Sequence, residues 1–145
     1  MSRQEPTVND VIRVGKISAV YPERGTATVQ FPDRDGLVSK ELAISQINTL
    51  KNKDESFLDP GEHVVCAFYG NGLSEGVILS AIYDTKNKPN AGDSDVRTTV
   101  FEDGTTFLVN RRGHIVEIKD SFGSYIRFAD GDIYIKSAAR LYLNE

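Results

Sequence analysis

The chain has 145 residues, of which 39% are hydrophobic and 26% charged, which is typical of a folded globular protein and argues against wholesale disorder. Its formal net charge is −4, and its Lys and Arg residues are interspersed with Asp and Glu, which argues against a nucleic-acid partner because phosphate binding needs a concentrated basic surface. The single cysteine, Cys66, excludes an intramolecular disulfide and a thiolate zinc cluster, so we interpret it as a small buried hydrophobe. No apolar run approaches the roughly 20 residues that span a bilayer, and the first residues lack a signal-peptide core, so we expect a soluble protein made inside a cell.

The first half of the chain predicts short strands and no helix. Residues 11–21 are rich in β-branched side chains and end at the turn sequence PERG, after which TATVQFP predicts the second strand of a hairpin. A third extended stretch has uncertain boundaries, and two buried strands follow the polar run NTLKNKDES. About five strands without a helix favour a small closed or half-closed barrel. The candidate strands are residues 11–21, 26–32, 37–47, 60–69 and 75–84.

The second half predicts a different arrangement, in which strands and tight turns repeat. Residues 85–97 are rich in Asn, Asp, Lys, Pro and Gly, and we interpret them as a linker. Beyond them, short alternating units recur about every eight to ten residues. The units are residues 105–110, 114–119, 124–129, 132–137 and 140–145.

Within the last four units the apolar residues alternate with polar or tyrosine side chains, so each unit offers one narrow apolar row. Such a sheet needs something to pack against. The rows could pack on the barrel, or identical rows from several chains could face one another about a symmetry axis. The unbroken alternation and the linker between the halves favour the second arrangement. The inward candidates are Val116, Ile118, Ile126, Phe128, Ile133, Ile135, Leu141 and Leu143.

No motif in the sequence predicts catalysis or metal binding. His63 and His114 lie in different halves and have no nearby Ser or Cys arrangement, so we interpret both as structural or solvated. Asp33 and Asp35 resemble the start of a calcium loop, but the later ligands of such a loop are missing. We therefore expect neither an enzyme nor a metal or cofactor site.

One glycine-rich stretch and one basic pair are candidates for a ligand site. The sequence YGNGLSEG at residues 69–76 lacks the Lys-Ser/Thr of a phosphate-binding loop and predicts a hairpin turn. Arg111 and Arg112 form a lone basic pair that is more typical of a solvated turn than of a nucleic-acid contact. A five-stranded barrel could still bind an oligonucleotide or oligosaccharide, but the sequence has no Trp and no basic cluster among its strand aromatics.

Three blocks of the sequence, in this order, carry a family resemblance that covers nearly the whole chain. They are VGKISAVYPERGTATVQFPDRDGLVSKEL, DPGEHVVCAFYGNGLSEGVILSAIYD and FEDGTTFLVNRRGHIVEI, of which PGEHVVCAFYGNGLSEGVILSAIY and FEDGTT are the most specific parts. The chain resembles the baseplate assembly protein V family, the central spikes of contractile phage tails and phage-like bacteriocins, which are related to the spike proteins of type VI secretion.

The resemblance implies an all-β homotrimer, with an N-terminal OB-fold barrel and a C-terminal intertwined triple-stranded β-helix. It implies a structural, non-enzymatic role at the tail baseplate: the barrels dock on the hub and tail tube, and the spike pierces the target cell envelope when the sheath contracts. The domain boundaries that we expect are an N-terminal arm at 1–9, the OB fold at 10–84, a linker at 85–97 and the spike at 98–145. The alternative hypothesis is a monomeric OB-type binding module, for an oligonucleotide or oligosaccharide, with a β-appendage.

The chain departs from the family at the expected tip, formed by Leu143, Asn144 and Glu145. Many members hold an iron ion there with a His-x-His pair, but no histidine follows His114 in this chain, so we expect no such ion. The sequence also has no room for the lysozyme domain that some spikes carry, and no carboxylate pair in a supporting context that would indicate glycan cleavage. Packed apolar side chains around Leu141 and Leu143, or a separate PAAR-like cap protein, would then close the tip.

Overall fold

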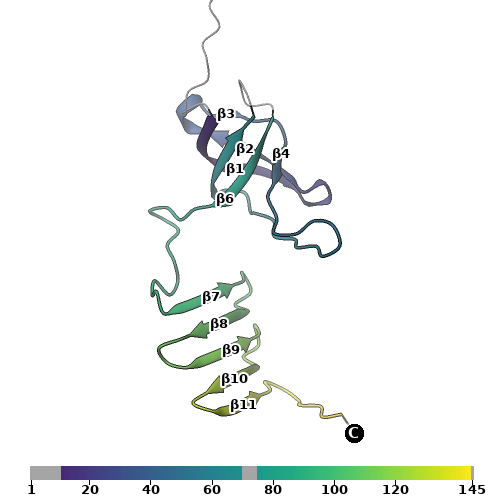
Figure 1. Ribbon diagram of the computed structural model, residues 1–145, viewed down its shortest axis with the longest axis vertical. Helices are drawn as coiled ribbons and strands as arrows, with labels where there is room; N and C mark the ends of the chain where they lie inside the picture. Colours follow the sequence, from purple (N-terminus) through teal and green to yellow (C-terminus); the bar gives the residue numbers. More distant parts are fainter. Residues whose placement is uncertain (1–10, 70–74, 145) are drawn as a thin grey trace, which may run out of the picture. The chain divides into compact units, whose positions relative to one another are not determined.

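The computed structural model of the protein describes residues 11–69 and 75–144. The expected N-terminal arm at 1–9, most of the glycine-rich turn and the tip residue Glu145 lie outside the described residues. The elements of the described part are strands, apart from two short 3-10 turns at Pro22–Arg24 and Pro32–Arg34 (Figure 1). The all-β class expected from the sequence is therefore confirmed. The chain divides into two compact units between Lys88 and Pro89, and each is described by itself below.

The first unit is a five-stranded barrel that closes because strand β1 pairs on both of its edges. The cyclic order is β1-β5-β6-β4-β2, and β2 returns to β1. All these pairings are antiparallel except that of β4 with β6, and a short strand, β3, adds to β2. The strands are β1 (Ile12–Tyr21), β2 (Thr26–Phe31), β3 (Leu37–Val38), β4 (Leu42–Ile44), β5 (His63–Phe68) and β6 (Gly76–Ala81).

The third extended stretch, expected as one strand over residues 37–47, is two short strands, β3 and β4. Ser39 separates them, because its hydroxyl accepts a hydrogen bond from the Val29 backbone N–H at 3.0 Å and donates one to the Lys40 carbonyl at 2.7 Å. A side chain that satisfies backbone groups in this way interrupts the regular ladder. The sequence prediction of a single strand was therefore wrong at this place, although the barrel itself is confirmed.

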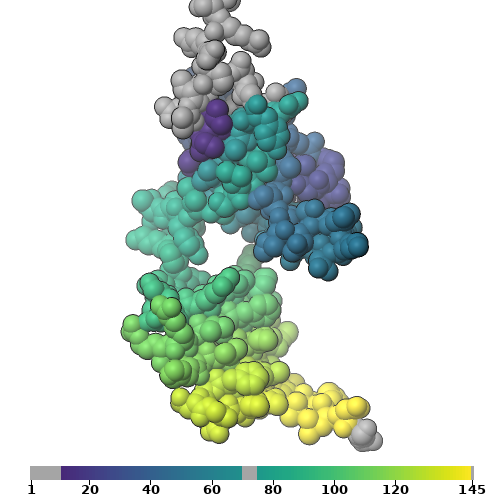
Figure 2. Space-filling model, in the orientation of Figure 1, coloured from purple at the N-terminus to yellow at the C-terminus, as the bar shows by residue number. Residues whose placement is uncertain are grey.

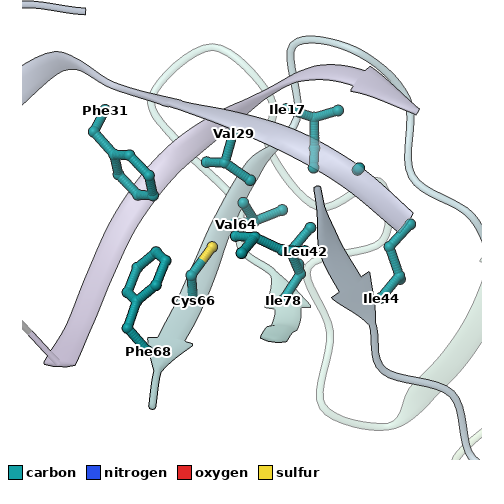
Figure 3. Packing of buried hydrophobic residues seen from close by; sticks show 10 residues of the cluster. Ile17, Val29, Phe31, Leu42, Ile44, Val64, Cys66, Phe68 and Ile78 are labelled. Carbon is teal, nitrogen blue, oxygen red and sulfur yellow. The ribbon is translucent and has the colours of Figure 1, made fainter. Parts of the chain in front are cut away.

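The core of the barrel is formed by alternate residues of its strands, as the period of a strand requires. Phe31 and Phe68 meet edge to face, with their ring centroids 5.8 Å apart. Cys66, on β5, belongs to the same buried cluster (Figure 3). Burial raises the pKa of the Cys66 thiol to about 11, so the thiol stays protonated and inert at neutral pH. The buried hydrophobic residues are Ile17, Ala27, Val29, Phe31, Leu42, Ile44, Val64, Cys66, Phe68 and Ile78.

Gly15 allows β1 and β2 to approach closely where the barrel closes. A Cβ atom at this position would lie 2.6 Å from Val29 Cγ1 and 2.7 Å from the Gln30 carbonyl oxygen. Both distances are shorter than real Cβ contacts, so any larger residue would push the two strands apart.

The second unit is one antiparallel sheet in which five strands follow one another in chain order (Figure 1). Each strand pairs with the next over all five of its residues, without a bulge. The strands are β7 (Val96–Val100), β8 (Thr106–Asn110), β9 (Ile115–Lys119), β10 (Tyr125–Ala129) and β11 (Asp132–Lys136).

Five strands are predicted from the sequence in this half, and four of them match β8, β9, β10 and β11. The prediction missed β7 and was wrong about the last strand. Strand β7 begins at Val96, inside the segment expected to be linker, because its backbone pairs with β8 and because Asp95 is held by Arg111 at its start. Residues 140–144, expected to be the last strand, form no strand in the described chain. The chain leaves β11 through a turn in which the Ala138 N–H donates to Ser124 Oγ at 2.8 Å and Ser137 Oγ donates to the Arg140 carbonyl at 2.7 Å.

The turns between these strands are held by side-chain oxygens that accept backbone N–H bonds. Asp120 Oδ1 accepts from Phe122 and Ser124, each at 2.9 Å, and Asn110 Oδ1 accepts from Arg112 at 3.1 Å and Gly113 at 2.9 Å. Asp103 Oδ1 accepts from Thr105 at 2.9 Å in the same way between β7 and β8, whereas the turn between β10 and β11 uses the positive φ of Asp130 and Gly131. These local features favour each reversal of the chain, which explains the frequent Asp, Asn and Gly residues between the strands.

Candidate functional site

One face of the second sheet is apolar and uncovered, and it is the strongest candidate functional surface. Ile126 on β10 lies opposite Ile118 on β9 and Ile135 on β11, and Phe128 lies opposite Val116 and Ile133. Six of the eight residues predicted to face a trimer axis therefore share one face. Strand β8 adds two more residues to it, in register with β9. We call this surface the apolar face; its residues are Phe107, Val109, Val116, Ile118, Ile126, Phe128, Ile133 and Ile135.

The side chains of the apolar face are open to solvent in the single chain. Their exposed fractions run from 44% for Val116 to 63% for Ile133, although they are large aliphatic or aromatic groups. Within the described part of the second unit no further layer of secondary structure covers them. A contiguous exposed apolar surface of this kind marks an interaction site, because a soluble monomer rarely leaves one uncovered.

The opposite face of the same sheet, which we call the polar face, carries most of the charged side chains of its strands, and two of them, Arg127 and Glu117, are paired. Arg127 Nε donates to Glu117 Oε2 at 2.5 Å across β9 and β10, and this hydrogen bond raises the pKa of Arg127 above its ordinary value. The guanidinium also lies 4.4 Å from the centre of the Tyr125 ring, an arrangement that favours a cation–π contact. The two faces thus differ sharply in chemistry, and only the apolar one needs a partner.

The apolar face has different borders on its two sides. Toward β7 the face becomes polar, since Thr99 lies opposite Phe107 and Arg97 opposite Val109. Phe101, just after β7, packs edge to face on Phe107, with the two ring centroids 5.6 Å apart. The hollow at this border is lined by Phe101, Phe107, Glu102, Asp103 and Thr105.

At the other border the structure separates the two remaining predicted axis residues. Leu141 lines a hollow together with Ile118, Ile126 and Ile135, so it lies beside the apolar face. Leu143 does not line this hollow; it and Asn144 belong to the exposed stretch that follows, and Leu143 is 76% exposed.

The other polar residues singled out in the sequence occupy turns and strand ends. Arg111 Nε lies 2.6 Å from Asp95 Oδ1, and Arg112 contacts the other oxygen of the same carboxylate, so the basic pair fixes the start of β7. Asp33 lies in the second 3-10 turn, where its carboxylate is 3.5 Å from the buried guanidinium of Arg13. His114 is a turn residue with a positive φ of 53°. Among the described residues no group of three or more His, Cys, Asp or Glu side chains is placed to hold a metal ion.

His63 contacts a carboxylate that the sequence analysis did not connect with it. Its Nδ1 atom meets Asp84 Oδ2, and both residues line a surface hollow with Ile82 and Tyr83. The Asp84 carboxylate also accepts the backbone N–H groups of Asn87 at 2.6 Å and Lys86 at 2.8 Å, and the Asn87 bond is the largest of the effects that lower the pKa of Asp84 to about 2. The pair thus ties the chain leaving the barrel to the start of β5.

This carboxylate predicts an acid dependence of the barrel's stability. Because folding lowers the pKa of Asp84 from about 4 to about 2, its stabilising effect is complete above pH 4 and is lost as the pH falls toward 2. We expect Asp84→Asn to lower the urea midpoint of the barrel at about pH 5 and to differ much less from the parent chain at about pH 2. Asp59→Asn, at an exposed position in the same unit, is the control and should follow the parent curve. Parallel pH curves for the parent and Asp84→Asn would contradict the assignment.

Neither a scan of the sequence against protein-family models nor a search of curated proteins found a match. In the described residues there is also no helix with the length and hydropathy needed to cross a membrane.

The sequence analysis missed Phe107 and Val109 as members of the apolar face. Their alternation was visible in TTFLVN, but Leu108, which points to the opposite side, makes this unit look apolar on both faces. The cross-strand pairs Phe107 with Ile118 and Val109 with Val116 remove that ambiguity.

Proposed function

We propose that this chain is the non-enzymatic central spike of a contractile tail, a homotrimer in which three copies of the apolar face enclose a common axis. The observation that carries the proposal is the apolar face itself, which combines regular in-register aliphatic and aromatic pairs with exposed fractions of 44–63%. Cyclic association of identical surfaces covers such a face without any second kind of chain. The family resemblance of the sequence supports the same arrangement.

The barrel supports the second part of the proposal, an OB-type domain that docks on the hub and tail tube of the baseplate. The closed barrel consists of β1, β2, β4, β5 and β6, so that β4 is its third strand in chain order and β6 its last. These two strands pair in parallel, which is consistent with an OB-type Greek-key barrel. Fold alone does not fix function, so the docking role rests on the resemblance and on the proposed spike beside it. The location that follows is the tail tip of a phage or of a phage-like bacteriocin particle.

The sheet supports the mechanical part of the proposal. Its five strands, each paired with the next over its full length, resist separation because many hydrogen bonds would have to break together. Burying the apolar face of three copies adds a dry core to that sheet. A stiff rod of this kind is suited to being driven through the envelope of a target cell when the sheath contracts.

The oligomeric mass of the purified chain tests the proposal directly. Three chains of 16.0 kDa give about 48 kDa, which sedimentation equilibrium and native mass spectrometry would both resolve from a monomer. A monomer at micromolar concentration would overturn the spike and leave the OB-type binding module as the better hypothesis. In a strain that makes the particle, deleting the chain should also abolish assembly of functional tails, and a chain that cannot form trimers should not restore them.

A further inference from the structure

Residues 140–144 have the pattern of a strand but form none in the single chain. We call them the 140–144 segment: Leu141 and Leu143 alternate with Arg140, Tyr142 and Asn144. Tyr142 is 81% exposed and Leu143 76%, and Figure 2 shows this part of the chain, in yellow, extending away from the body of the second unit. An extended segment with an apolar row and no strand partner in the described chain is suited to adding to the edge of another sheet.

The local geometry directs this segment away from its own strand β11. Ser124 stands one position beyond the Tyr125–Lys136 pair, and its hydroxyl binds the Ala138 N–H at 2.8 Å. The chain therefore continues past the start of β10 and does not reverse onto the free edge of β11. A hairpin closed by residues 137–139 would also place Arg140 opposite Lys136, and like charges in that position oppose pairing.

Strand β11 offers the matching acceptor. In the described part of the chain it pairs with β10 alone, so its second edge presents backbone N–H and C=O groups that have no strand partner. The other edge strand of the sheet, β7, lies at the opposite end of the strand order. At its β11 end, each copy thus carries one strand-like segment without a strand partner and one free edge. In a cyclic trimer these numbers match, because every segment can reach the edge of the next copy.

We propose that the 140–144 segment pairs with the free edge of β11 in the neighbouring copy, so that each sheet of the trimer gains one exchanged strand. The proposal rests on the proposed trimer and adds to it the contact between copies. It gives Leu143, which is 76% exposed in the single chain, a place next to the row formed by Ile133 and Ile135 of the neighbouring copy. Leu141, which lies beside Ile126 and Ile135 of its own chain, would move to the same row of that copy.

The alternation of side chains restricts the register. A shift by one residue would turn Leu141 and Leu143 to the polar face, so they must share the face of Ile133 and Ile135. Aligning the centres of the two strands then sets Tyr142 opposite Tyr134, whether the strands run parallel or antiparallel. Charge favours the parallel alignment, in which Arg140 meets Asp132 rather than Lys136.

Disulfide trapping tests the exchange. A chain carrying Tyr134→Cys and Tyr142→Cys should, on mild oxidation of the trimer, run as a covalently linked trimer on a non-reducing denaturing gel. Shifted registers are covered by combining Tyr142→Cys with Asp132→Cys or Lys136→Cys. Chains with only one new cysteine are the negative controls, since Cys66 is fully buried. Tyr125→Cys with Lys136→Cys, a pair in register within one chain, is the positive control and should give a bridged monomer.

Every outcome bears on the exchange. Linked trimers support it, whereas bridged monomers from the Tyr142 pairs would show that the segment folds onto its own chain. Absence of any bridge at the three β11 positions, in a trimer whose positive control oxidises, would overturn it and leave the proposed spike intact. A native mass of 16.0 kDa would instead overturn the spike and the exchange together.

Discussion

Replacing Ile126 with Asp is expected to abolish the proposed trimer and to leave the chain monomeric at micromolar concentration. Ile126 stands at the centre of the apolar face, between Ile118 and Ile135. In the proposed trimer the change would place three carboxylates about one dry axis. Each buried carboxylate without an ionic partner would cost several kcal/mol. In a monomer the same side chain is 45% exposed, so the substitution would have little effect on folding. Sedimentation equilibrium of the variant measures the outcome.

Tyr125→Asp is the matched control for this experiment. Tyr125 precedes Ile126 on β10 and lies on the polar face of the same sheet, opposite Lys119 and Lys136, where a new carboxylate would lie near two cations. We expect this variant to keep the oligomeric state of the parent chain. Trimers that survive Ile126→Asp unchanged would refute the assignment of the apolar face to the axis, and loss of the trimer in both variants would show that any new charge in the sheet is enough.

Replacing Phe31 with Ala is expected to destabilise the barrel by about 3–5 kcal/mol, because it removes a fully buried ring and leaves a cavity beside Phe68. Since the stability of a whole domain is only about 5–15 kcal/mol, much of the barrel's stability would be lost. Denaturant unfolding followed by circular dichroism measures the change, and hydrogen exchange resolved by peptide assigns it to β2 and β5 rather than to the second sheet.

Phe122→Ala is the control for this substitution, because it removes the same ring from a position that is 83% exposed. We expect it to change the free energy of unfolding by no more than about 0.5 kcal/mol. Similar losses for the two variants would mean that the ring of Phe31 is not packed in the way that the barrel requires.

The sequence was most informative where alternation and turn residues agree. The spacing of Ile118, Ile126 and Ile135 predicted which side chains share a face, and the cross-strand register brings them together. In β2 the same two-residue period buries Val29 and Phe31, although the sequence prediction named only the strand and not its buried residues. Alternation of this kind is a local signal, and each residue's face is fixed once its strand is placed.

The missed features depend on contacts between residues far apart in the sequence. Strand β7 follows a polar segment, and its start depends on Asp95 meeting Arg111 across the sheet. The break between β3 and β4 depends on Ser39 reaching the backbone of Val29. Arg13 is buried although Ile12 and Val14 beside it are exposed, because the arginine points inward on β1 toward Asp33. Such pairings have no signature within a short window of sequence.

The turns between its strands also make the second sheet modular. Because consecutive strands run in opposite directions, an insertion or deletion of two strands with their turns would return the chain to the same side and leave every remaining pair in register. With neighbouring strands about 4.8 Å apart, each such change would alter the sheet by about 10 Å. The length of this unit can therefore change in even steps during evolution, or by design, without any redesign of the barrel.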